Sequence, residues 1–182
     1  MSKMIFVNLP VRDLAKAKAF YEAMGAVNNP QFSDATSACM VVSDTIFVML
    51  LTHDKWVFFT KKPIADARNA SEAMLAISCD TRQAVDAMTD AAAAHGGQAD
   101  VNPKQDHGFM YGRSFEDPDG HIWEAFFMDM SQMPKGAGRR ITAAVGEVTS
   151  SGEVPQSRDV SIGPSLAPAG QWDKADVSAT RR

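Results

Sequence analysis

Apolar and polar positions alternate in a way that predicts a strand and then a helix at the start of the chain. The run 4–11, MIFVNLPV, consists largely of strand formers, and its proline lies near the end, where a strand tolerates one. Asp13 can then cap a helix over 14–24, whose apolar residues recur at helical spacing before Gly25. Three short β-prone runs follow, at 30–34, 37–42 and 45–52, with a turn at Ser43 and Asp44.

The same order of elements returns after a lysine-rich linker at 61–71. The run 74–79 predicts a strand, Asp80 or Thr81 can cap the next helix, and Gly96–Gly97 ends it. Three more strands are expected at 98–102, 109–116 and 121–128, the last two joined by a turn at Asp117–Gly120. The chain therefore predicts two βαβββ modules, at about 1–60 and 72–130. Each has too small an apolar face to stand alone, so we expect one α+β domain over 1–130.

Residues 131–182 differ in kind. Gly, Pro, Ser and Thr punctuate this stretch, Trp172 is its only aromatic residue, and no apolar period lasts for a whole helix. We interpret it as a flexible C-terminal tail. The run 141–148 could instead add a strand or contact a partner, and a non-native extension is a further alternative.

Length, composition and charge limit the class of protein and the partners that this chain could bind. The 182 residues suit one domain with a tail, and 45% hydrophobic with 22% charged residues is ordinary globular usage. No window has the roughly 18 apolar residues of a membrane span, and the start lacks a signal-peptide core, so a cytoplasmic protein is expected. The net charge of -4 and pI near 5.5 argue against binding to nucleic acid. Cys39 and Cys79 form no CxxC motif, which predicts reduced thiols.

Two segments together carry a family resemblance. The opening LPVRDL at 9–14 runs into AFY at 19–21 and Gly25, and the segment 115–124 reads FEDPDGHIWE. This pair of motifs resembles the vicinal oxygen chelate superfamily, which includes glyoxalase I, bleomycin-resistance proteins, extradiol dioxygenases and fosfomycin-resistance enzymes. The resemblance implies paired βαβββ modules whose sheets curl into a cup that holds a divalent metal or a ligand. It also implies a homodimer, because the family often dimerises.

The metal ligands that the resemblance implies are mostly replaced here. Metal-binding members place a His on the first strand of each module, where this chain has Phe6 and Met74. They place a Glu on the last strand, which gives Glu124 in the second module. In the first module the equivalent is Val48, or Met49 if the preceding turn is one residue longer. Divalent ions need three or more N or O donors, so we expect no metal at this position. The alternative is a divalent metal held by Glu124 with His53 or His107.

The register of the second hairpin determines which residue lies opposite Glu124. If Asp117–Gly120 is a four-residue loop, counting outward places Arg113 opposite Glu124 and Tyr111 opposite Phe126. A bidentate guanidinium could then replace the charge of the missing ion. A register changed by one residue would turn Ser114 inward instead.

Alternation along the strands gives the other inward positions. They are Met4, Phe6 and Asn8, then Ile46, Val48 and Leu50, then Met74, Ala76 and Ser78. The candidate catalytic residue is Glu124, and the candidate ligand-binding residues are Phe6, Asn8, Val48, Met74, Ser78, Tyr111, Arg113 and Phe126. Asn8 and Ser78 could orient a ligand by hydrogen bonds, although a buried asparagine bonded to backbone is the commoner explanation.

These residues predict a protein that binds a small, largely apolar molecule in a metal-free cup. An enzyme is the alternative: a metal-dependent lyase or dioxygenase relative, or a lyase or isomerase with Glu124 as general base. A non-catalytic interaction module is the third. The run 56–59, WVFF, predicts a short helix or lid, or else a dimer face.

Overall fold

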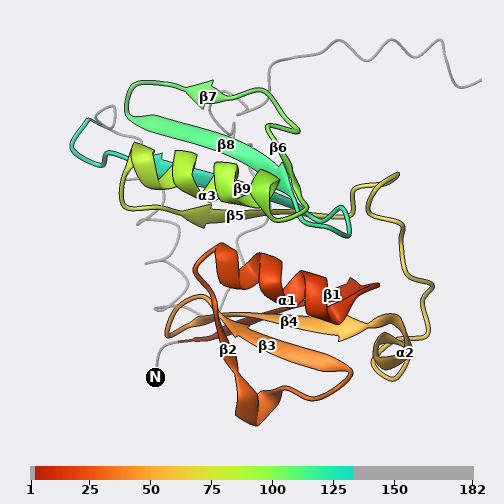
Figure 1. Cartoon of the computed structure of the whole chain (residues 1–182). Coiled ribbons are helices and arrows are strands. Elements are labelled where there is room, and N and C mark those ends of the chain that lie inside the picture. Colours follow the sequence, from red (N-terminus) through yellow and green to blue (C-terminus); the bar gives the residue numbers. More distant parts are fainter. Residues whose placement is uncertain (1–2, 133–182) are drawn as a thin grey trace, which may run out of the picture. The chain divides into compact units, whose positions relative to one another are not determined.

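The structure, a computed structural model that describes residues 3–132, contains the two expected modules (Figure 1). The first consists of β1 (Ile5–Val11), α1 (Leu14–Ala23), β2 (Val27–Asn29), the 3₁₀ helix η1 (Pro30–Phe32), β3 (Ser37–Val41), β4 (Ile46–Thr52) and the short helix α2 (His53–Trp56). The second consists of β5 (Met74–Ser78), α3 (Arg82–Ala94), β6 (Gln98–Ala99), β7 (Gln105–Asp106), β8 (Met110–Glu116) and β9 (Ile122–Met128).

The helix boundaries follow from their caps. The Asp13 side chain accepts a hydrogen bond from the Lys16 amide at 3.0 Å, and Gly25 after the helix has a positive φ of 91°. Of the two candidate caps for α3, Thr81 is the one used, because its hydroxyl accepts from the Ala84 amide at 3.0 Å.

Each module forms one mixed sheet. In the first sheet the strand order is β1-β4-β3-β2, with β1 parallel to β4; in the second it is β5-β9-β8-β6, with β5 parallel to β9 and β7 paired to β8. The α+β class and the two modules with flanking helices are confirmed. The strands are divided between two sheets and do not join into one.

Two strand predictions differ from the structure. The β-prone run at 30–34 is a 3₁₀ helix because Pro30 cannot donate to a ladder and the Asn29 side chain caps the Gln31 amide at 3.0 Å. The strand before it is β2. The predicted strand 98–102 stops at Ala99, since Asp100 adopts a left-handed φ of 53°, and the chain pairs again only as β7.

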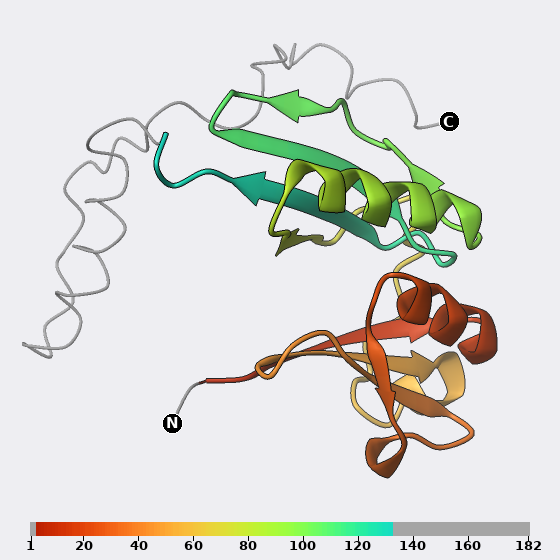
Figure 2. The same cartoon turned by 60° about the vertical axis from the view of Figure 1, so that its left-hand side comes forward.

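The helix-bearing faces of both sheets contribute to one apolar core. It includes Leu9, Val11, Val48 and Leu50 from the first sheet, Phe20 and Tyr21 from α1, Val85 and Ala92 from α3, and Phe115, Trp123 and Ala125 from the second sheet. Side chains alternate along a strand, so Phe6 on β1 and Glu124 on β9 lie on the faces turned away from this core. Figure 2 shows α1 and α3 between the two sheets.

A buried polar contact joins the modules within this core. The Tyr21 hydroxyl on α1 donates to the Asp117 carboxylate at 2.8 Å and accepts from the Trp123 indole at 3.1 Å. Burial raises the pKa of both Tyr21 and Asp117 above their usual values. The turn between β8 and β9 therefore serves as a contact between modules.

No helix among residues 3–132 is long and apolar enough to cross a bilayer. The predicted tail, with the run 141–148 and Trp172, lies outside the described residues apart from positions 131 and 132. In the predicted lid, α2 ends at Trp56, and Phe58 and Phe59 after it are exposed.

Candidate functional site

Glu124 lies at the centre of the outer face of the second sheet. It pairs with Ala76 on β5 and with Ser114 on β8, and its side chain is half-buried. Alternation places Met74, Ser78 and Phe126 on the same face, as the sequence predicted. Its neighbours on this face are the apolar residues Ala76, Ile122 and Phe126 and the polar Ser114.

The predicted partner of Glu124 is wrong by one residue of register. The hairpin loop has five residues, because the Asp117 carboxylate accepts from the amides of Asp119 and His121, both at 2.9 Å. Glu116 therefore pairs with Ile122 and not with His121.

This shift of register changes the pairing partners of three residues of β8. Ser114 is opposite Glu124, the alternative that a changed register predicted, while Arg113 is opposite Ala125 and Tyr111 opposite Phe127. Arg113 and Tyr111 consequently lie on the helix-bearing face and not in the predicted cup. The Ser114 hydroxyl is itself occupied, accepting from the Asn102 amide at 2.7 Å.

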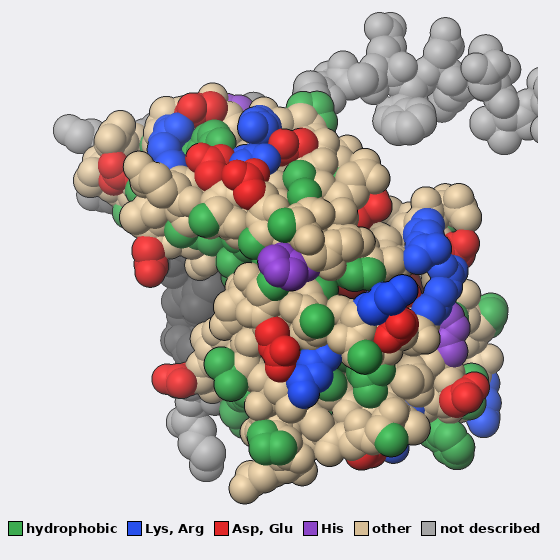
Figure 3. Space-filling model, in the orientation of Figure 1, with side chains coloured by type: hydrophobic (Ala, Val, Ile, Leu, Met, Phe, Trp, Pro, Cys, Tyr) green, Lys and Arg blue, Asp and Glu red, His purple; other side chains and the backbone are tan. Residues whose placement is uncertain are grey.

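Arg113 is held by three carboxylates. Its guanidinium binds Asp100 through two hydrogen bonds of 2.9 and 2.8 Å, and it contacts Asp86 and Asp90 at 3.0 Å each. The Tyr111 hydroxyl also donates to Asp86, at 2.8 Å. Hydrogen bonding to Arg113 lowers the pKa of Asp100, and the bond from Tyr111 lowers that of Asp86. Acidic and basic side chains gather over α3 and β8 in Figure 3. Arg113 thus anchors α3 and the segment after β6 to β8.

A second arginine pair holds β7 to α3. Arg82 binds the Asp106 carboxylate through bonds of 2.7 and 2.9 Å, which lower the pKa of Asp106 to about 2. The pKa lies below its value of about 3.9 in an unfolded chain, so this pair stabilises the fold above pH ~3.9. That stabilisation is lost as the pH falls through about 2.

The Arg82→Gln substitution is expected to raise the pKa of Asp106 toward about 3.9, because the charged donor is removed. An NMR titration of carboxyl carbons measures it. Asp34 is the internal control, because the backbone and hydroxyl of Thr36 lower its pKa to about 2 independently of Arg82. An unchanged titration of Asp106 would show that the Arg82 pair is not responsible.

In the first module, Phe6 and Asn8 lie on the outer face, as predicted. Phe6 stacks on Phe47 of β4 with ring centroids 4.6 Å apart. Val48 is fully buried in the core, so its predicted place beside Phe6 is wrong. Ile46 and Leu50 share the parity of Val48, so their predicted inward placement is wrong as well. The turn before β4 is one residue longer than expected, and Met49, the stated alternative, takes the outer position opposite Asn8.

The residues at the family's metal positions do not fit a divalent ion. Phe6, Met49, Met74 and Glu124 supply one carboxylate, two thioethers and no imidazole. No group of three or more His, Cys, Asp or Glu side chains within residues 3–132 could hold a metal.

The two histidines that could have held a metal together with Glu124 lie elsewhere. His107 precedes β8 and donates its amide to the carbonyl of Met110, which pairs with Met128. Glu124 lies four residues before Met128 on β9, a strand distance of about 13 Å. His53 begins α2 in the first module and lines a small cavity that it shares with His121. The proposed set of Glu124 with His53 or His107 is therefore not assembled in the described chain.

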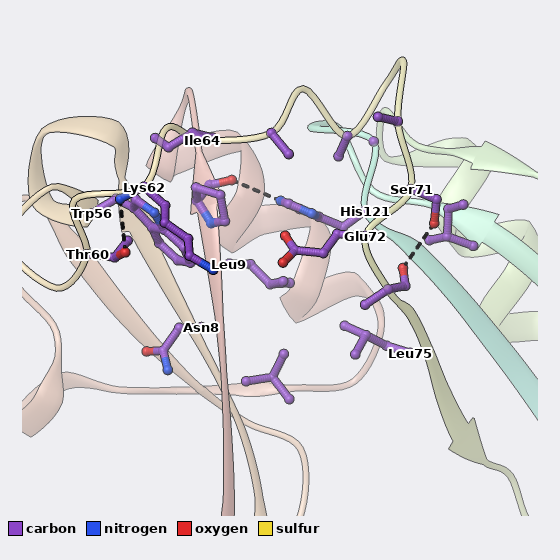
Figure 4. A pocket seen from close by; sticks show the side chains of 18 of the residues that line it. Asn8, Leu9, Trp56, Thr60, Lys62, Ile64, Ser71, Glu72, Leu75 and His121 are labelled. Atoms are coloured by element: carbon purple, nitrogen blue, oxygen red, sulfur yellow. Dashed lines mark hydrogen bonds between the residues drawn. The ribbon is translucent and has the colours of Figure 1, made fainter.

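A cavity of about 600 Å³ lies between β1, β5 and the linker that joins the modules (Figure 4). Of the predicted site residues only Asn8 lines it; Glu124 does not. Its walls include residues that the sequence interpretation assigned to the linker 61–71, among them Lys62, Ile64 and Ser71. The sequence interpretation missed them; the signal that could have found them is the mixture of apolar and charged residues in 60–73, next to Trp56.

Comparison with known proteins agrees with this architecture. The model of the Glyoxalase/Bleomycin resistance protein/Dioxygenase superfamily matches residues 3–125, so the chain belongs to that superfamily. A comparison with the curated proteins found no significant match.

Solved structures of similar fold come from several bacteria. A hypothetical protein, SA1046, from S. aureus is 23% identical with a TM-score of 0.59, covering 70% of this chain and 94% of its own. A glyoxalase-related enzyme from Fulvimarina pelagi is 21% identical with a TM-score of 0.59, covering 75% and 94%. The fosfomycin resistance protein FosX from Listeria monocytogenes is 18% identical with a TM-score of 0.51, covering 77% and 98%. At these identities the likeness concerns the fold alone.

Proposed function

We propose that the chain binds a small, largely apolar molecule on the face centred on Glu124, without an ion at the family's metal position. The observation that carries this proposal is the isolation of the carboxylate. Within residues 3–132 no hydrogen bond or ion pair reaches it, because Arg113 is engaged on the other side of the sheet. A half-buried carboxylate on an apolar face favours a ligand that carries a positive charge or a hydrogen-bond donor.

The proposal includes a second copy of the chain over these outer faces. Phe6 and Met74 are 49% and 52% exposed, although both are large apolar side chains near the start of a strand. Covering them would enclose Glu124 and Phe6, which in one chain both face away from the core. A homodimer is the simplest arrangement that does so.

Catalysis by Glu124 as a general base is the second candidate. The position of Arg113 on the opposite face of the sheet favours this candidate, since no cation of the described residues pairs with the Glu124 carboxylate. Lyase or isomerase chemistry without a metal would use the same residue and the same face.

A matched pair of naphthalene ligands tests the binding site. We expect 2-naphthylmethylammonium to bind about tenfold more tightly than 2-naphthoate, because only the cation can pair with Glu124. Glu124→Gln should abolish this preference, measured by titration calorimetry. Glu22→Gln on α1 is the control with the same change of charge.

Two results would contradict the proposal. An unchanged preference in Glu124→Gln would place the ligand elsewhere. Stoichiometric metal in protein purified without chelator, lost in Glu124→Gln, would reject the metal-free site. Light scattering on the same preparations gives the mass, and a monomer would reject the second copy.

A further inference from the structure

The cavity between the modules presents two opposite charges that are not paired with each other. Lys62 follows α2 at the start of the linker, and Glu72 lies at its end, just before β5. Figure 4 shows both side chains directed into the same space. Among residues 3–132 neither forms an ion pair within 4.0 Å. The fold therefore holds a cation and an anion at the same cavity without joining them.

The rest of the cavity is largely apolar. Leu9 of β1 and Leu75 of β5 face it from the two sheets, and Trp56 and Ile64 line it from the side of α2 and the linker. The one polar ring among its walls, His121, is engaged with the carbonyl of Pro10 at 2.9 Å. A volume of about 600 Å³ is within the range of small-molecule sites in proteins.

These features together define the chemistry of an occupant. A carboxylate would pair with Lys62, an ammonium group with Glu72, and an apolar side chain with the walls. A molecule that carries both charges satisfies both side chains at once, whereas a singly charged molecule leaves one of them without a partner.

We propose that this cavity is a second binding site, specific for a small zwitterion with an apolar side chain, the chemistry of an apolar α-amino acid. Neither charged residue belongs to the Glu124 face, so the proposal does not depend on the proposed function. It assigns the linker a role in recognition, with one charged contact at each end.

Three probes of similar shape test the site by NMR on the full chain. L-phenylalanine carries both charges, 3-phenylpropionate lacks the ammonium group, and phenethylamine lacks the carboxylate. We expect phenylalanine to shift the amide signals of β1, β5 and the linker and the indole signal of Trp56. We expect the other two probes to bind about tenfold more weakly, since each loses one charged contact.

Charge-neutral variants separate the two contacts. Lys62→Gln should weaken phenylalanine binding about tenfold and leave phenethylamine unaffected, while Glu72→Gln should weaken phenylalanine and leave 3-phenylpropionate unaffected. Both side chains are exposed, so these variants are expected to fold. Lys61→Gln, one residue away and outside the cavity wall, is the matched control for the lysine, and Glu22→Gln is the control for the glutamate.

The outcomes are distinct. Equal binding of the three probes, no binding of any, or shifts confined to the Glu124 face would each overturn the proposal. Weakening by Lys61→Gln as strong as that by Lys62→Gln would also overturn it, because the effect would then reflect net charge and not the site. A failed naphthalene test at Glu124 leaves these expectations unchanged.

Discussion

Replacing Gly97 by alanine is expected to destabilise the chain by about 3 kcal/mol or more. A Cβ atom there would collide with the carbonyl oxygen of Glu116 and would lie 2.7 Å from the Phe20 ring and 3.0 Å from the Ala92 carbonyl. Two of these neighbours are backbone, which cannot move without disturbing β8 and the end of α3. Phe20 belongs to the first module, so the added methyl group would also disturb the packing between the two modules. Urea denaturation followed by circular dichroism measures the loss.

Gly112→Ala is the matched control for this prediction. A Cβ at Gly112 would meet its nearest atoms at 3.6 and 3.7 Å, an ordinary contact distance. Alanine also loses less backbone freedom on folding, so this variant is expected to be neutral or more stable by up to about 1 kcal/mol. Equal losses in the two variants would show that glycine itself, and not the close approach at Gly97, decides the stability.

Arg113→Met is expected to destabilise the chain by about 3 kcal/mol, because it removes the buried member of a charge network and leaves its carboxylates crowded together. The Arg113 side chain is only 7% exposed and contacts Asp86, Asp90 and Asp100. Arg82→Met, at the start of α3, is the control. Its pair with Asp106 is more exposed and is screened by solvent, so we expect a much smaller loss than for Arg113→Met.

Double-mutant cycles locate the partner of Arg113. Arg113→Met combined with Asp100→Asn should be strongly non-additive, since the two residues share two hydrogen bonds. Combined with Glu124→Gln it should be additive within about 0.5 kcal/mol, because the two side chains lie on opposite faces of the sheet. Coupling between Arg113 and Glu124 would contradict the register of β8 and β9.

Local signals in the sequence were sufficient for most of the elements. Asp13 and Gly25 delimit α1 because a cap side chain and a left-handed glycine act within a few residues of the helix. The alternation along β1 and β5 likewise placed Phe6, Asn8 and Met74 on their correct face. These predictions required no knowledge of distant contacts.

The register of the hairpins depended on more than sequence spacing. A one-residue extension of the loop at Asp117 reverses every side chain of β8 relative to Glu124, because the period of a strand is two. The extension results from the Asp117 carboxylate, which binds two amides of its own loop and also accepts from Tyr21, 96 residues away. In the first module, the turn before β4 is likewise one residue longer than expected. Val48 is therefore buried in the core, and Met49 lies on the outer face.

By itself, the sequence determined the two βαβββ modules, the superfamily and the replacement of the family's metal ligands, because these reside in local pattern and residue identity. Only the tertiary structure decided which side chains share a face and that Arg113 serves α3 instead of Glu124. It alone revealed the cavity between Lys62 and Glu72. The physical reason is that register, burial and cavities arise where segments far apart in the chain pack together, and a local pattern carries no record of that packing.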